Sequence, residues 1–207
     1  MFWGNSTGDV ASESFMMKLL NRPAVLSPTH ALLKGVAWLI VGVIMGWYFH
    51  LIPTSVVSFT WADVRLMWHL ALALVSWISS TVLLFAVAAL LNRRVVITEL
   101  FGRMLYAHWP VLLMMLPGVV DDKVAYSTFM QSPELAFSGH ALYASCMSLM
   151  CIVIIVWYLY WGYVAFSRSA MRSNAIVVVL YLVAMVVSWY ISNVALDAVY
   201  AGLVQQI

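Results

Sequence analysis

An uncharged apolar segment that follows a basic hinge lies at the centre of this chain and constrains how the whole chain can fold. The segment over residues 92–120 contains Arg93, Arg94 and Arg103 in its first part and carries no charge over residues 104–120. Two long apolar runs precede this segment and two follow it. Apolar runs of this length are typical of helices that cross a lipid bilayer.

Charged residues make up only 9% of the 207-residue chain, and hydrophobic residues make up 65%. A soluble domain carries about 25% charged residues, so this chain could not cover a water-facing surface. The net charge of +2 and the lack of a basic arm argue against nucleic acid as a partner. The sequence therefore predicts an all-α, polytopic integral membrane protein whose first partner is the lipid bilayer.

Two regions are predicted, a cytoplasmic segment over residues 1–30 and a five-helix transmembrane domain over residues 31–207. No basic stretch followed by an apolar run marks a cleavable signal peptide, so we expect the first span to be an uncleaved anchor. The expected spans cover residues 32–52, 61–91, 104–120, 140–166 and 175–203. The second span, about 46 Å long at about 1.5 Å per residue, exceeds a bilayer core of about 30 Å and should tilt or project.

The N-terminal segment predicts a short amphipathic helix that ends at Asn21-Arg22-Pro23. One face of that helix would carry Phe15, Met16, Leu19 and Leu20. It could lie in the headgroup region of the cytoplasmic leaflet, or it could pack against the protein's own loops. Ser27 and Pro28 then predict the start of the first long helix, with serine as N-cap and proline at the first helical position.

Two further local patterns predict helix boundaries and irregularities. Residues 53–59 are expected to form a loop, and Thr60 with Asp63 resembles a capping box that opens the second span. Pro110 and Pro117 each remove a helical hydrogen bond and should kink or break the third span, although Pro117 could simply end it.

Small residues form faces on two of the expected spans. Gly35, Gly42 and Gly46 align along the first span, and Ser188 and Ser192 contribute to a small face on the last one. Such faces let another helix backbone approach closely. They serve packing within the chain or self-association.

Charge asymmetry predicts the orientation of the five spans. Alternate threading leaves only Arg65 and Lys123 on one side, and the basic residues on the other side set the topology. These are Lys18, Arg22, Lys34, Arg93, Arg94, Arg103, Arg168 and Arg172. The N-terminus is therefore expected in the cytoplasm and the C-terminus outside.

Few residues offer chemistry within the expected spans. Apart from Asp63 at the start of the second span, Asp197 is the only acidic residue in the five runs. An ionisable residue in a span suggests function by default. With His50, His69 and His140 at the same outer level, Asp197 could bind an ion such as Zn²⁺ or relay protons. The alternative is that these histidines are unrelated interface residues.

The sequence shows no residues or motifs that indicate other chemistry. His108 is expected to hydrogen-bond a carbonyl freed by Pro110, and Cys146 and Cys151 are expected to be packing residues. No metalloprotease, nucleophile-elbow or nucleotide-binding motif occurs. We therefore expect no cofactor and no catalytic residue, and a non-enzymatic role is favoured.

Two motifs and the topology together resemble the Yip family of five-span membrane proteins, first known as Ypt/Rab interactors. The motifs are Asn21-Arg22-Pro23 before the first span and Glu99-Leu100-Phe101-Gly102-Arg103-Met104-Leu105-Tyr106 at the start of the third. The resemblance implies a multi-pass protein of the bacterial inner membrane, and it implies no catalytic residues. The long acidic or aromatic arm of the trafficking branch is missing here, which puts Rab binding in doubt.

Three hypotheses for function follow from these observations. The first is a Yip-like protein that binds membrane partners, protein or lipid, through its small-residue faces and its amphipathic N-terminal helix. It would act by self-association or as an accessory subunit of a transport or trafficking assembly. The second is a small transporter or permease subunit with a path between the kinked third helix and the last one, gated by Asp197. The third is a membrane metal site built from the outer histidines.

Overall fold

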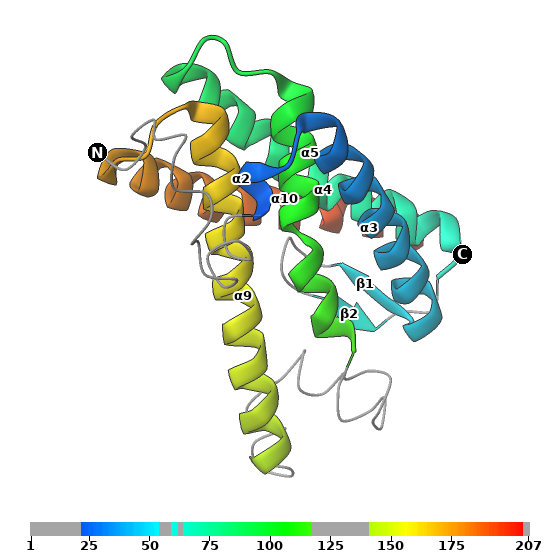
Figure 1. Ribbon diagram of the computed structural model, residues 1–207. Coiled ribbons are helices and arrows are strands. Elements are labelled where there is room, and N and C mark those ends of the chain that lie inside the picture. The colour runs from blue at the N-terminus through cyan, green and yellow to red at the C-terminus, as the bar shows by residue number, and fades with distance from the viewer. Residues whose placement is uncertain (1–21, 54–58, 62–63, 117–140, 205–207) are drawn as a thin grey trace.

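The computed structural model describes residues 22–53, 59–61, 64–116 and 141–204, and nearly all of these residues are helical. Figure 1 shows the helices crossing around a central green rod, with one long helix extending below the others. The helices are α2 (Arg22–Val25), α3 (Pro28–Phe49), α4 (Leu66–Leu91), α5 (Ile97–Ala107), the 3₁₀ helix η1 (Trp109–Met115), α9 (Ala141–Ala170) and α10 (Ala175–Val204). The amphipathic helix expected near the N-terminus falls on residues 1–21, which lie outside the described residues.

The start of α3 confirms the predicted cap. The Ser27 hydroxyl accepts a hydrogen bond from the His30 N–H, and Pro28 occupies the first helical position. Pro23, expected to end a helix, instead lies in the single turn of α2 and is buried there. Proline is tolerated in a first turn because the N–H groups there have no intrahelical partner.

A short hairpin replaces the loop and helix start predicted after the first span. Strand β1 (Leu51–Pro53) pairs antiparallel with β2 (Phe59–Trp61), with Leu51 opposite Trp61. Thr60 therefore lies in a strand rather than at a helix cap, and Asp63 lies outside the described residues. The second long helix begins at Leu66 instead of Trp61, and its N-cap Arg65 makes no side-chain capping bond. Strand pairing satisfies backbone groups that would otherwise be buried without partners.

The central rod in Figure 1 consists of α5 and η1. The α-helix ends at Ala107, and the chain continues from Trp109 as a 3₁₀ helix with Pro110 near its start. Pro110 has no N–H to donate, and the Val111 N–H bonds the His108 carbonyl three residues back. The backbone thus changes helix type where the proline was expected to kink it. Pro117 lies outside the described residues.

Helices α3 and α5 cross with their backbones almost in contact. A Cβ added at Gly102 would lie 2.8 Å from the Leu32 nitrogen, and one added at Gly35 would lie 2.6 Å from the Leu105 Cβ. Only glycine permits so close an approach. This crossing fixes the central rod against the first long helix.

Aromatic rings join the rod to α3 and α9. Trp109 stacks on Trp38 with ring centroids 5.3 Å apart, and Tyr106 stacks on Trp161 at 5.5 Å. Trp157 packs edge-on against Trp109 at 5.3 Å. Offset and edge-to-face geometries such as these are the favourable ones for aromatic pairs. The rings of Tyr106 and Trp161 are buried in the core.

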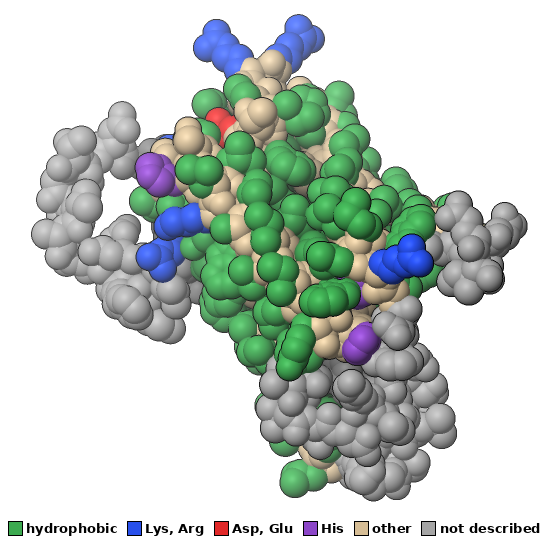
Figure 2. Space-filling view, turned by 90° about the vertical axis from the view of Figure 1, so that its right-hand side faces the viewer, with side chains coloured by type: hydrophobic (Ala, Val, Ile, Leu, Met, Phe, Trp, Pro, Cys, Tyr) green, Lys and Arg blue, Asp and Glu red, His purple; other side chains and the backbone are tan. Residues whose placement is uncertain are grey.

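Four of the helices are long and apolar enough to cross a membrane: α3, α4, α9 and α10. Their most apolar windows have mean hydropathies of 1.7, 2.2, 2.2 and 2.3. Figure 2 shows apolar side chains over the middle of the molecule, with lysine and arginine at its edges. The chain is therefore a helical integral membrane protein.

Candidate functional site

The glycines of α3 are used inside the chain. Gly42 faces the side chain of Leu112 on η1, and Gly46 faces the Leu51 carbonyl of the hairpin. With Gly35 against α5, all three glycines are buried in contacts with the rod or hairpin. Their close packing within the chain leaves this face unavailable for self-association.

The small face of α10 is also internal. Ser188 and Ser192 are both fully buried on the helix, which packs against α4. The Ser192 hydroxyl donates a 2.9 Å hydrogen bond to the Trp189 carbonyl one turn earlier. Both small-residue faces named from the sequence thus pack inside the protein.

The basic residues expected to set the topology separate into two groups. Arg93, Arg94, Arg168 and Arg172 are exposed beside the turns that end α4 and α9. The Asn92 amide donates a 3.2 Å hydrogen bond to the Ser169 carbonyl, which brings these two turns together. The exposed arginines therefore gather at one end of the molecule.

Arg103 differs from the other arginines because it is 4% exposed. Its guanidinium forms a 2.9 Å ion pair with Glu99, one turn earlier on α5. Arg103 therefore acts as a paired charge inside the helix packing.

The residues proposed for an ion site do not form one cluster in the described part of the chain. His69 is buried, His50 ends α3 with a left-handed backbone (φ 56°), and Asp197 is exposed on α10. His140 lies outside the described residues. No group of three histidine, cysteine or acidic side chains in the described ranges is arranged to hold a metal ion.

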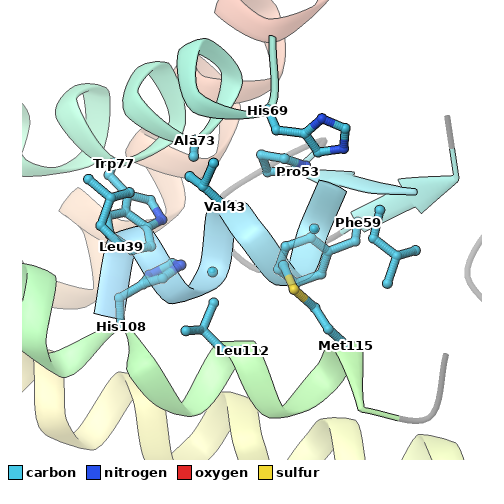
Figure 3. Close-up of a pocket in the computed structure, with 13 residues that line it drawn as sticks. Leu39, Val43, Pro53, Phe59, His69, Ala73, Trp77, His108, Leu112 and Met115 are labelled. Carbon is cyan, nitrogen blue, oxygen red and sulfur yellow. The ribbon is translucent and has the colours of Figure 1, made fainter. Parts of the chain in front are cut away.

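A cavity beside the rod is lined by two histidines, one at each end. We name it the hairpin cavity; its empty volume is about 390 Å³, part of which opens to the outside. Its walls come from α3, α4, η1 and the hairpin, and they include Leu39, Val43, Phe59, Ala73 and Leu112. Figure 3 shows His69 beside Pro53 at one end and His108 beside Leu39 and Trp77 at the other.

His108 lies between the hairpin cavity and a second one. This second cavity, which we name the Tyr158 cavity, is lined by Ser80, Thr81 and Tyr158. Its empty volume is about 210 Å³, part of which opens to the outside. Trp77 and His108 line both cavities. The imidazole of His108 therefore forms part of the wall between them.

The environment of His108 differs from the expected one. Its ring lies 4.4 Å from the Trp77 ring and 5.1 Å from the Tyr158 ring, measured between centroids. It makes no side-chain hydrogen bond to the described residues, so the predicted bond to a freed carbonyl is wrong. A histidine beside Pro110 was the only signal of this site in the sequence. Trp77 and Tyr158 lie on other helices, α4 and α9, and could not be assigned to it.

No known protein family model matches this chain, and no curated protein or solved structure matches it significantly. The class of the protein therefore rests on its own helices and cavities.

Proposed function

We propose that this chain is a five-span, Yip-like membrane protein that acts by binding another membrane component, protein or lipid. Two arguments support the proposal. The first concerns the number and direction of the crossings. The second, which carries the function, concerns the position of Asp197.

The ends of α4 and α9 support a fifth crossing. The Asn92–Ser169 hydrogen bond brings the C-terminal end of α4 beside that of α9. If both helices span the bilayer, their N-terminal ends both lie on the opposite side. The chain between Asn92 and Ala141 must then cross once more, and α5 with η1 begins that return (Figure 1).

The charge distribution supports the orientation. Arg93, Arg94, Arg168 and Arg172 lie at the end where α4 meets α9, and cytoplasmic loops carry an excess of arginine and lysine. We infer that this end faces the cytoplasm. The hairpin and the C-terminal end of α10 then face outward, in a multi-pass protein of the bacterial inner membrane.

Asp197 is the observation that carries the binding function. It is exposed on α10, a candidate span, and lies in line with the exposed side chains of Val194 and Tyr190. Ionisable residues in membrane helices almost always face the protein interior or pair with another group. A membrane partner with a lysine, an arginine or an amine headgroup would supply the opposite charge.

Neither cavity supports the alternative path gated by Asp197. The two cavities adjoin the rod, α3, α4 and α9, and Asp197 lines neither of them. The exposure of the carboxylate instead supports contact with a partner outside the chain. A transported solute within the described cavities would not meet it.

Purification from native membranes in mild detergent, followed by mass spectrometry, tests the proposal. We expect Asp197→Asn to retain at most about a tenth of the wild-type partner, which corresponds to about 1.4 kcal/mol of binding. Ala198→Asn, at an adjacent exposed position, adds the same amide while keeping the carboxylate and should retain the partner. Equal recovery with Asp197→Asn and wild type would refute binding through Asp197.

A further inference from the structure

His108 lines two cavities, and this arrangement points beyond partner binding. Only 5% of the His108 surface is exposed. Among the described residues, none forms a hydrogen bond with its ring nitrogens. An imidazole offers one donor and one acceptor nitrogen. Because His108 lines both cavities, a molecule in either one could bond these nitrogens.

Each cavity contains other polar groups that a small hydrogen-bonding molecule could reach. In the Tyr158 cavity, Ser80 and Thr81 each donate a 2.9 Å hydrogen bond to the Trp77 carbonyl, so their oxygens can still accept one. The Tyr158 hydroxyl bonds no described residue and can donate. In the hairpin cavity, His69 lies at the end opposite His108 (Figure 3).

Water fits these requirements. A buried water needs a site large enough to hold it and commonly makes two to four hydrogen bonds to polar groups. Both cavities have room for a water-sized molecule. The other walls of the hairpin cavity are mainly apolar, so hydrogen-bonding partners lie chiefly at its two histidine ends.

We propose that water occupies both cavities and that His108 passes protons between them, along a chain from His69 to Tyr158. In each transfer, one ring nitrogen accepts a proton from water on one side. The other nitrogen releases its proton to water on the opposite side. A flip of the imidazole ring then exchanges the positions of its two nitrogens and resets the ring for the next transfer, with no net change in charge or bonding.

Vesicles that contain the full chain and a pH-sensitive dye test this relay under an imposed proton gradient. With phosphatidylcholine and phosphatidylglycerol as the lipids, we expect proton flux above that of protein-free vesicles. His108→Phe should lower the protein-dependent flux by about 100-fold, the low end of the effect of removing an acid–base group. His30→Phe removes an exposed histidine outside both cavities and should conduct like wild type.

A second variant separates proton transfer from folding and hydration. His108→Gln keeps a donor and an acceptor for water, but its amide cannot replace imidazole as an acid–base group. We expect it to remain monodisperse, to retain water contacts in NMR spectra of labelled side chains, and to conduct as little as His108→Phe. Wild-type flux equal to that of protein-free vesicles, or wild-type flux in His108→Gln, would overturn the relay. Absence of water contacts at His108 in the wild-type protein would overturn the proposal that water occupies the two cavities.

Discussion

The contact between Gly102 and α3 gives the sharpest test of how the central rod is packed. In Gly102→Ala the new Cβ would lie 2.8, 2.9 and 3.0 Å from the nitrogen, Cα and Cβ of Leu32. Two of these three atoms belong to the backbone and cannot rotate away. Relief of the overlap requires α3 and α5 to separate by roughly half an ångström.

The magnitude follows from two opposing effects. Alanine improves helix propensity over glycine by about 1 kcal/mol. Overpacking of a rigid site costs about 1–3 kcal/mol, and we take the upper end because backbone atoms are involved. We therefore expect Gly102→Ala to lower the free energy of unfolding by about 1–2 kcal/mol.

Gly42→Ala is the matched control on the partner helix. Its Cβ would lie 2.7 Å from the Leu112 Cδ2 atom, the end of a flexible side chain that can move. The expected change is within about 0.5 kcal/mol of wild type, because the propensity gain offsets the local adjustment. The two substitutions are chemically identical, so their difference isolates the backbone contact.

Equilibrium unfolding in mixed micelles, with sodium dodecyl sulfate as denaturant, measures these changes. Gly35→Ala meets the same interface, with a Cβ 3.0 Å from the Tyr106 nitrogen and 3.1 Å from the Gly102 carbonyl oxygen. Because one separation of the helices relieves both overlaps, the double variant should cost less than the two single changes together. A Gly102→Ala protein at least as stable as wild type would refute the close crossing.

Three further predictions concern other local contacts. Glu99→Gln leaves Arg103 buried without its ion pair and should lower the free energy of unfolding by about 1–2 kcal/mol in the same assay. This loss is smaller than that expected for breaking a fully buried ion pair, because Glu99 is partly exposed. Ser27→Ala removes the α3 cap and should cost about 1 kcal/mol, whereas Ser27→Asp should restore most of it. Asn92→Ala breaks the bond to the Ser169 carbonyl and should speed amide hydrogen exchange at both turns; unchanged exchange would contradict that link.

Long apolar runs and local caps were the features that sequence could predict. The last helix was expected over residues 175–203 and spans Ala175–Val204, since an uninterrupted apolar run has one good solution in lipid. Ser27 and Pro28 specify their helix start through bonds to nearby residues. Local chemistry therefore predicts elements well where the partners are close in sequence.

The hairpin and the His108 environment depended on distant partners. Strands of three residues are too short to show alternation, and Thr60 with Asp63 matched a capping pattern that the fold does not use at Thr60. Burial of Arg103 could not be inferred from its charge, because its position depends on how α5 packs among α3 and α9. The cavity histidines are likewise brought together by helix crossings that one sequence does not specify.

Cysteine labelling measures the proposed membrane crossings most directly. Single cysteines at Arg65, Arg94, Leu142 and Arg172, in a chain lacking Cys146 and Cys151, are treated in intact cells with a membrane-impermeant maleimide. We predict labelling at positions 65 and 142 in intact cells, and at positions 94 and 172 only after permeabilisation. Labelling of positions 94 and 142 under the same condition would contradict a crossing by the segment that contains the central rod.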